Sequence, residues 1–213
     1  MVEEWRDVTA TVPDSREEGA ALLLEVLGAA CPGGDVRLIG SMGRPGGADA
    51  FSDIDLRWTV PAGRAPGQLG SLRSTLHRVG VVESLRVDPE PRRDRRLVFV
   101  RFQGWPLWWR VDLEIHAVGI GSRQMSDADP WSPYESACMG VVVTLKALAR
   151  HRPDTAEDLL AGARQRVDAP EVTGSWPERI DSLLDDLATR SPATADLVSR
   201  TRDLARDVLR REP

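Results

Sequence analysis

Residues 40–56 of this chain read GSMGRPGGADAFSDIDL, a glycine-rich turn followed by two alternating aspartates. Because residues two apart in a β-strand point to the same side, Asp53 and Asp55 are expected on one face, while the alternate apolar residues enter a core. Carboxylates held this close repel each other unless a cation lies between them, and Mg²⁺ favours such oxygen ligands together with phosphate groups. The stretch therefore predicts a two-metal site or a magnesium–triphosphate site, with the turn at Gly40 and Ser41 beside the phosphates.

The overall composition is that of an ordinary globular protein. The 213 residues are 41% hydrophobic and 29% charged, enough for one large domain or two small ones. No run approaches 18 apolar residues, so no membrane span is expected, and the polar N-terminus does not resemble a secretory signal. Cys31 and Cys138 are too few for a disulfide framework, which favours a cytoplasmic setting. The net charge of −5 argues against a dedicated nucleic-acid binder and is compatible with a cationic small-molecule partner.

Hydrophobic periodicity divides the first part of the chain into helices and strands. Helices are expected at 14–30 and 68–79, and strands at 36–39, 53–60, 97–102 and 107–118, the last two forming a hairpin. The strand 107–118 alternates apolar residues with a polar set: Arg110, Asp112, Glu114 and His116. A face with so many charges lies either in solvent or in a site, and its two carboxylates favour a site.

The last third of the sequence has helical periodicity throughout. Helices are expected at 133–150, 154–167, 177–190 and 192–210. The first of them begins with a capping box, Ser132 to Glu135, and with proline at its first position. The chain is therefore predicted to be an α/β protein, with a mixed-sheet domain over residues 1–125 and a helical domain over residues 126–213.

The order of these motifs resembles that of a known superfamily. Gly40-Ser41 is followed by Asp53-Ile54-Asp55-Leu56, and a third carboxylate, Asp112, lies on a later strand. This pattern is similar to the signature of the nucleotidyltransferase superfamily that includes DNA polymerase beta. The resemblance covers roughly residues 20–118, and the helical remainder looks like the C-terminal half of nucleotidyltransferases that modify aminoglycosides or lincosamides. It implies a nucleotidyltransferase-fold mixed sheet with flanking helices, followed by a C-terminal helical bundle.

The resemblance also implies roles for the carboxylates. Asp53 and Asp55 would bind the metal ions that bridge the triphosphate. Asp112 matches the third carboxylate, which binds a metal or takes the proton of the attacking hydroxyl. Glu114 lies two residues further along on the same face and competes with Asp112 for the role of base.

Phosphate contacts are implied for a second set of residues: Gly40, Ser41, Arg44 and Lys146. The first three belong to the turn. Lys146 lies in the middle of the first C-terminal helix, where relatives place a basic residue that reaches the triphosphate. The alternative is a surface lysine whose aliphatic stem packs on apolar neighbours.

The activity implied is Mg²⁺-dependent transfer of a nucleoside monophosphate from a nucleoside triphosphate, with ATP as the expected donor. The acceptor would be a hydroxyl of a small molecule such as an aminoglycoside-like antibiotic, and pyrophosphate would be released. Two alternatives stay open: an antitoxin-like nucleotidyltransferase that modifies a protein or a tRNA, and a non-catalytic module that binds nucleotide.

Two further groups of side chains are open to more than one interpretation. Trp108, Trp109 and Trp131 either stack on a nucleobase or substrate ring, or pack between the two halves of the chain. Asp127 and Asp129 either attract a cationic acceptor or serve the structure.

Overall fold

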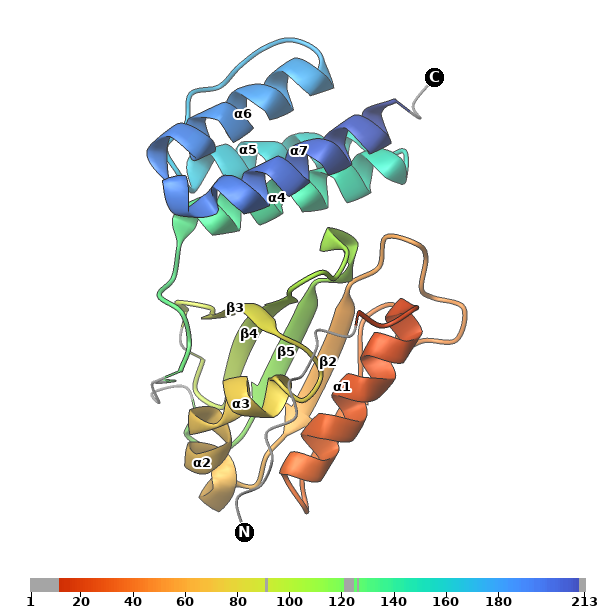
Figure 1. Ribbon diagram of the computed structural model, residues 1–213, viewed down its shortest axis with the longest axis vertical. Helices are drawn as coiled ribbons and strands as arrows, with labels where there is room; N and C mark the ends of the chain where they lie inside the picture. Colours follow the sequence, from red (N-terminus) through yellow and green to blue (C-terminus); the bar gives the residue numbers. More distant parts are fainter. Residues whose placement is uncertain (1–11, 91, 121–124, 126, 211–213) are drawn as a thin grey trace. The chain divides into compact units, whose positions relative to one another are not determined.

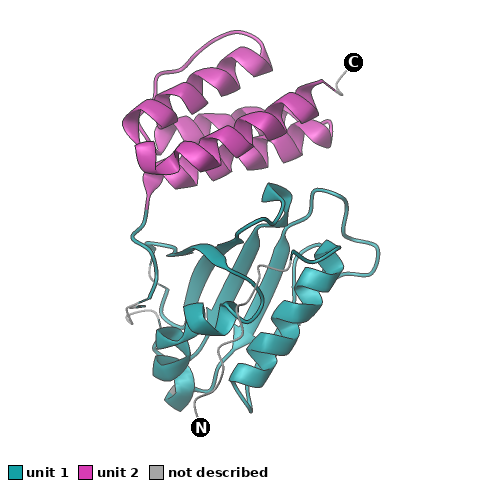
Figure 2. Cartoon of the chain, in the orientation of Figure 1, with its two compact units in different colours: residues 1–131 teal, residues 132–213 magenta. Residues whose placement is uncertain are grey.

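The computed structural model describes residues 12–90, 92–120, 125 and 127–210. The chain separates into two compact units, residues 1–131 and 132–213 (Figure 2). The boundary expected from the sequence, after residue 125, borders residues outside the described ranges. In the structure the chain is divided between Trp131 and Ser132.

The first unit begins with helix α1, Arg16–Ala30. The Ser15 side chain accepts a hydrogen bond of 3.1 Å from the Glu18 backbone N–H and so satisfies one of the unpaired donors of the first turn. Leu23 and Leu27, four residues apart, are fully buried because they lie on the same side of the helix. The helix predicted at 14–30 is thus confirmed.

A five-stranded mixed sheet forms the centre of this unit. The strands are β1 (Asp35–Leu38), β2 (Ile54–Thr59), β3 (Val82–Val87), β4 (Arg95–Phe102) and β5 (Val111–His116). They lie in the order β1-β2-β5-β4-β3. β2 and β5 are parallel, and the other neighbouring pairs are antiparallel. The α/β class expected from the sequence is confirmed by this sheet and its helices.

The two faces of the sheet differ in polarity. Alternate residues of β2 and β5, such as Leu56 and Leu113, are buried in the apolar core. Helices α1, α2 (Ala65–Gly70) and α3 (Leu72–Leu76) lie on this side of the sheet (Figure 1). The intervening residues are polar, most of them charged, and point to the opposite face, so the alternation predicted for both strands is confirmed.

Three local features differ from the expectation. The helix predicted at 68–79 is two short helices that meet at Ser71, because glycines before it weaken the helix and the Ser71 hydroxyl donates to the Gly67 carbonyl. The strand predicted from 107 begins at Val111, since Pro106 starts a 3₁₀ turn, η2 (Leu107–Trp109). A further short turn, η1 (Ala62–Arg64), precedes α2.

Strand β3 was not expected from the sequence at all. A register shift between Val82 and Ser84 marks a bulge opposite β4. The bulge lets Val82 and Leu85, three residues apart, both enter the core. Because the apolar residues are not spaced two apart here, the pattern that reveals other strands is missing.

The second unit is helical over its described residues, 132–210. It contains α4 (Pro133–Ala149), α5 (Pro153–Gln165), α6 (Trp176–Arg190), the short turn η4 (Pro192–Thr194) and α7 (Ala195–Leu209), as the magenta part of Figure 2 shows. The Ser132 side chain accepts from the Glu135 N–H at 3.2 Å, which confirms the expected cap. Buried side chains such as Leu145, Leu160 and Leu184 fill its core. Of the helices described, none is both long and apolar enough to cross a bilayer.

Candidate functional site

The site predicted from the sequence starts where β1 ends and the glycine-rich turn begins. The backbone N–H of Ile39 donates to the Asp55 carbonyl at 2.9 Å, which keeps the chain beside β2. Gly40 follows with a φ of +59°. A Cβ atom at residue 40 would lie only 2.1 Å from Oδ2 of Asp55, so only glycine fits there. The turn backbone is therefore in direct contact with one of the predicted metal ligands.

The turn itself is held by local hydrogen bonds. The Gly43 N–H donates to the Ile39 carbonyl at 3.0 Å. At its far end, the buried Ser52 side chain and Asp49 exchange hydrogen bonds of 2.9–3.0 Å. Ser41 is half-buried and Arg44 is exposed.

Arg16 of α1 fixes the far end of the same segment. Its Nη1 donates to the carbonyl oxygens of Asp49 and Ser52, the second at 3.2 Å, although the residue is only 9% exposed. These bonds hold the chain immediately before Asp53. The sequence pattern did not reveal this role because Arg16 and Ser52 are far apart along the chain.

The three predicted carboxylates come together at the start of the parallel pair β2 and β5. Asp55 lies directly opposite Asp112 in the strand register. Asp53 immediately precedes β2, and the N–H of the next residue, Ile54, donates to the Arg110 carbonyl at 2.9 Å. The side chains of Asp53 and Asp112 are 21% and 15% exposed, so both reach solvent from the polar face.

Arg110 joins this cluster as an internal cation. Its Nη2 lies 2.6 Å from Oδ2 of Asp112 and 3.8 Å from Oδ2 of Asp53. Its guanidinium also lies over the Phe99 ring, 5.7 Å from the centroid. Burial alone would lower the pKa of Arg110, but the charges of Asp112 and Asp53 outweigh it and raise that pKa. The sequence placed Arg110 on the polar face without a role; its position two residues before Asp112 was the available signal.

The donor set suits a hard divalent cation in its chemistry. Asp53, Asp55 and Asp112 offer carboxylate oxygens from adjacent strand ends. They do not form a ready cage: within the described residues, no group of three or more His, Cys, Asp or Glu side chains is arranged to hold a metal ion. Mg²⁺ commonly takes one or two protein carboxylates and completes its shell with substrate phosphates and water, so no all-protein cage is needed.

Glu114 has a different environment from Asp112. Its carboxylate lies 3.0 Å from Arg57, 3.1 Å from Arg95 and 3.2 Å from His116. Burial alone would raise the pKa of Glu114, but the hydrogen bonds from His116 and Arg57 and the charge of Arg95 lower it overall. Because a lowered pKa weakens a carboxylate as a base, these contacts suit Glu114 to an ion network better than to proton removal.

We expect Glu114→Gln to lower the free energy of unfolding at pH 7 by about 1–2 kcal/mol. A carboxylate with a lowered pKa in the folded state stabilises the protein above its unfolded pKa, and this stabilisation is lost as the pH falls through the folded value. The difference from the parent should therefore shrink below about pH 4.5, the ordinary value for this carboxyl. Urea unfolding at several pH values measures it, with the exposed Glu25→Gln as control. An equal loss at every pH would contradict the electrostatic explanation.

The remaining predicted residues are distributed over both units. Lys146 lies on α4 of the second unit and is only 2% exposed, so the alternative of a surface lysine is wrong. Its predicted contact with the triphosphate stays a prediction. Trp108 packs edge-on against Phe51 at 5.3 Å, and Trp109 packs against Trp105 at 6.1 Å, both within the first unit.

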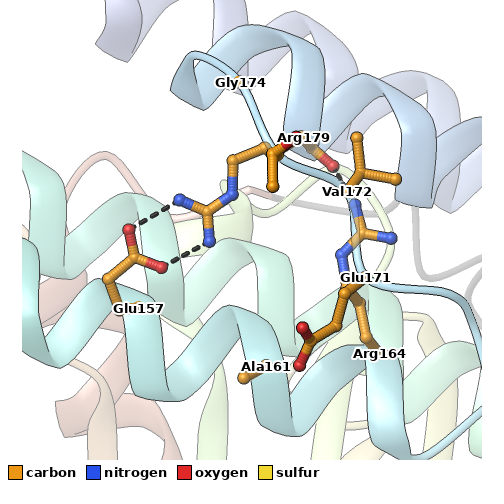
Figure 3. A pocket seen from close by; sticks show the side chains of 8 residues that line it. Glu157, Ala161, Arg164, Glu171, Val172, Gly174 and Arg179 are labelled. Atoms are coloured by element: carbon orange, nitrogen blue, oxygen red, sulfur yellow. Dashed lines mark hydrogen bonds and ion pairs between the residues drawn. The ribbon is translucent and has the colours of Figure 1, made fainter.

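A pocket apart from the carboxylates lies within the helical unit. It is a pocket of about 420 Å³ between α5, the segment 171–174 and α6 (Figure 3). Two arginines line it, and both have partners: Arg179 pairs with Glu157, and Arg164 donates to the carbonyls of Pro170 and Arg179. Burial, and then the charge of Arg179, lower the pKa of Arg164. These contacts join α5 to α6, which accounts for the charged lining without a ligand.

None of the comparisons, with models of protein families, with curated proteins and with solved structures, gives a match to this chain.

Proposed function

We propose that this protein is a nucleotidyltransferase that moves a nucleoside monophosphate from a Mg²⁺-bound nucleoside triphosphate, with ATP as the donor, to a hydroxyl of a small molecule. The observation that carries the proposal is the strand register, which sets Asp55 opposite Asp112. Asp53 lies two residues before Asp55, and the backbone of Gly40 packs against the Asp55 carboxylate. Adjacent carboxylates at strand ends beside a glycine turn are suited to metal–triphosphate binding.

Different residues of the site bind the phosphates, bind the metal and orient the carboxylates. The turn that begins at Gly40 offers backbone N–H groups to the β- and γ-phosphates, with Ser41 and Arg44 beside them. Asp53 and Asp55 hold the metal–triphosphate complex. When bound, Mg²⁺ would neutralise charge around the α-phosphorus and on the departing pyrophosphate. Arg110 keeps the carboxylates of Asp112 and Asp53 oriented through its contacts at 2.6 and 3.8 Å.

The transfer exchanges one phosphorus–oxygen bond for another. The acceptor oxygen bonds to the α-phosphorus, while the bond from the α-phosphorus to the oxygen that leads to the β-phosphorus breaks. Pyrophosphate leaves with that electron pair. Asp112 takes the hydroxyl proton and passes it to solvent. We favour Asp112 over Glu114 as the base because Asp112 lies opposite Asp55 in the strand register, whereas Glu114 lies two residues further along, opposite Arg57.

The proposal is tested by pyrophosphate release from ATP in the presence of Mg²⁺ and a panel of hydroxyl acceptors, with mass spectrometry of the acceptor. We expect release that requires both Mg²⁺ and an acceptor, together with an acceptor heavier by one adenylyl group. Omission of Mg²⁺, or its removal with a chelator, should abolish both signals. ATP binding by calorimetry that is indifferent to Mg²⁺, without any release, would instead indicate a nucleotide-binding module.

A further inference from the structure

The polar face of the sheet continues past Asp112 onto β4 and β3. In the strand register, Asp112 lies opposite Phe99 on β4, and Phe99 lies opposite Arg86 on β3. Directly paired residues of antiparallel strands have side chains that lie side by side on one face. A line of side chains therefore runs from the carboxylates across Phe99, on the side away from Gly40 and the turn.

An aromatic pair occupies the first part of this line. The Phe99 ring lies 6.1 Å from the ring of Trp131, at an interplanar angle of 51°. Trp131 is 38% exposed, a large fraction for a tryptophan that packs on another ring. A flat molecule stacked on Trp131 and Phe99 would lie one strand away from Asp112. In the proposed reaction, the acceptor hydroxyl must reach Asp112.

The charges around this pair are largely balanced by ion pairs. On β4, Arg95 is paired with Glu114 at 3.1 Å and Arg101 with Glu83 at 3.2 Å, and Asp112 is paired with Arg110 at 2.6 Å. Such a surface offers little net negative charge to a polycation and tolerates a neutral or anionic molecule.

The other nearby acids are also engaged. Oδ2 of Asp127 accepts from the Arg73 N–H at 2.9 Å. Asp129 pairs with Arg73 at 2.8 Å and accepts from the Leu85 N–H at 2.8 Å. These contacts attach residues 127–129 to α3 and β3, so both aspartates serve the structure and do not form an acidic site for a cationic acceptor.

We propose that the acceptor is a hydroxyl compound with a flat aromatic ring and no net positive charge, and that its ring stacks on Trp131 and Phe99 beside Asp112. This inference rests on the proposed function and narrows its acceptor. It departs from the polycationic aminoglycoside expected from the sequence, which becomes the competing outcome of the test.

The test uses three sugar probes that differ in ring and charge: p-nitrophenyl glucoside, methyl glucoside and kanamycin. Binding is measured by ligand-observed NMR on the full chain with Asp55→Asn, a variant expected to be unable to transfer. We expect p-nitrophenyl glucoside to bind at least about tenfold more tightly than methyl glucoside, and kanamycin not to compete with it. In the same background, Trp131→Ala should weaken the binding of p-nitrophenyl glucoside about tenfold. Trp176 is a half-buried tryptophan on α6, and Trp176→Ala should not change this affinity.

Two results would overturn the inference. The first is kanamycin binding as tightly as p-nitrophenyl glucoside. The second is an equal affinity of the Trp131→Ala and Trp176→Ala variants for p-nitrophenyl glucoside, which includes the case in which neither variant, nor their Asp55→Asn background, binds it. The binding does not depend on turnover, so its outcome is separate from that of the pyrophosphate assay on the parent chain. If the parent chain transfers a nucleotide to kanamycin and Trp131→Ala does not change that transfer, the proposed function stands and the proposal of an aromatic acceptor is wrong.

Discussion

Asp55→Asn is expected to reduce nucleotidyl transfer by at least about a thousandfold, equivalent to roughly 4 kcal/mol of lost transition-state stabilisation. The amide keeps the size of the side chain, so the contact with Gly40 and the register opposite Asp112 can persist. What is lost is the negative charge that we propose for binding the metal–triphosphate complex. Pyrophosphate release at saturating ATP and Mg²⁺ measures the effect.

The same substitution should leave the folded state intact or slightly more stable. Asp53, Asp55 and Asp112 carry like charges close together, and removing one of them relieves repulsion. Urea unfolding of Asp55→Asn in the absence of Mg²⁺ checks this, and the exposed Asp35→Asn on β1 serves as the matched control for both measurements. Transfer by Asp55→Asn at more than a tenth of the parent rate would eliminate Asp55 from the mechanism.

Gly40→Ala is expected to reduce transfer by about a hundredfold, because a displacement of about 1 Å in a catalytic group can have that effect. The new methyl group would lie 2.1 Å from Oδ2 and 2.9 Å from Cγ of Asp55, far inside contact distance. Either the Asp55 carboxylate or the turn has to move. The φ of +59° adds a backbone cost of about 1–2 kcal/mol for any residue with a Cβ.

Gly46→Ala separates these two causes. Gly46 belongs to the same turn and has a similar φ of +65°, but a Cβ there meets nothing within 4 Å. In urea unfolding, Gly46→Ala should therefore lose about 1–2 kcal/mol, and Gly40→Ala should lose more because of its clash with Asp55. Only Gly40→Ala should lose transfer. An equal loss of transfer in both variants would mean that the turn conformation matters and the contact with Asp55 does not.

Much of the local structure follows from the sequence. The cap at Ser15, the cap at Ser132 and the alternation along β2 and β5 depend on residues within a few positions of one another. Such short-range preferences are visible in a single sequence, so most of the helices and the polar faces of these strands were predicted close to where they lie, the helix at 68–79 being the exception. The α/β class follows from the same patterns.

The features that failed prediction have identifiable causes. The bulge between Val82 and Ser84 removes the two-residue period of β3, and Pro106 starts a 3₁₀ turn where a strand was expected. In each case a contact with a distant segment, or one residue with special geometry, outweighs the local pattern.

The sequence by itself determined which chemical groups this protein has for its site: two alternating aspartates, a third on a later strand and a glycine before them. Only the tertiary structure decided how these groups come together. The parallel pairing of β2 and β5 sets Asp55 opposite Asp112. Ion pairs join Arg110 to Asp112 and hold Glu114 in a separate network. The reason is that periodicity depends on neighbours along the chain, whereas strand pairing and register depend on which distant segments bury their apolar faces together.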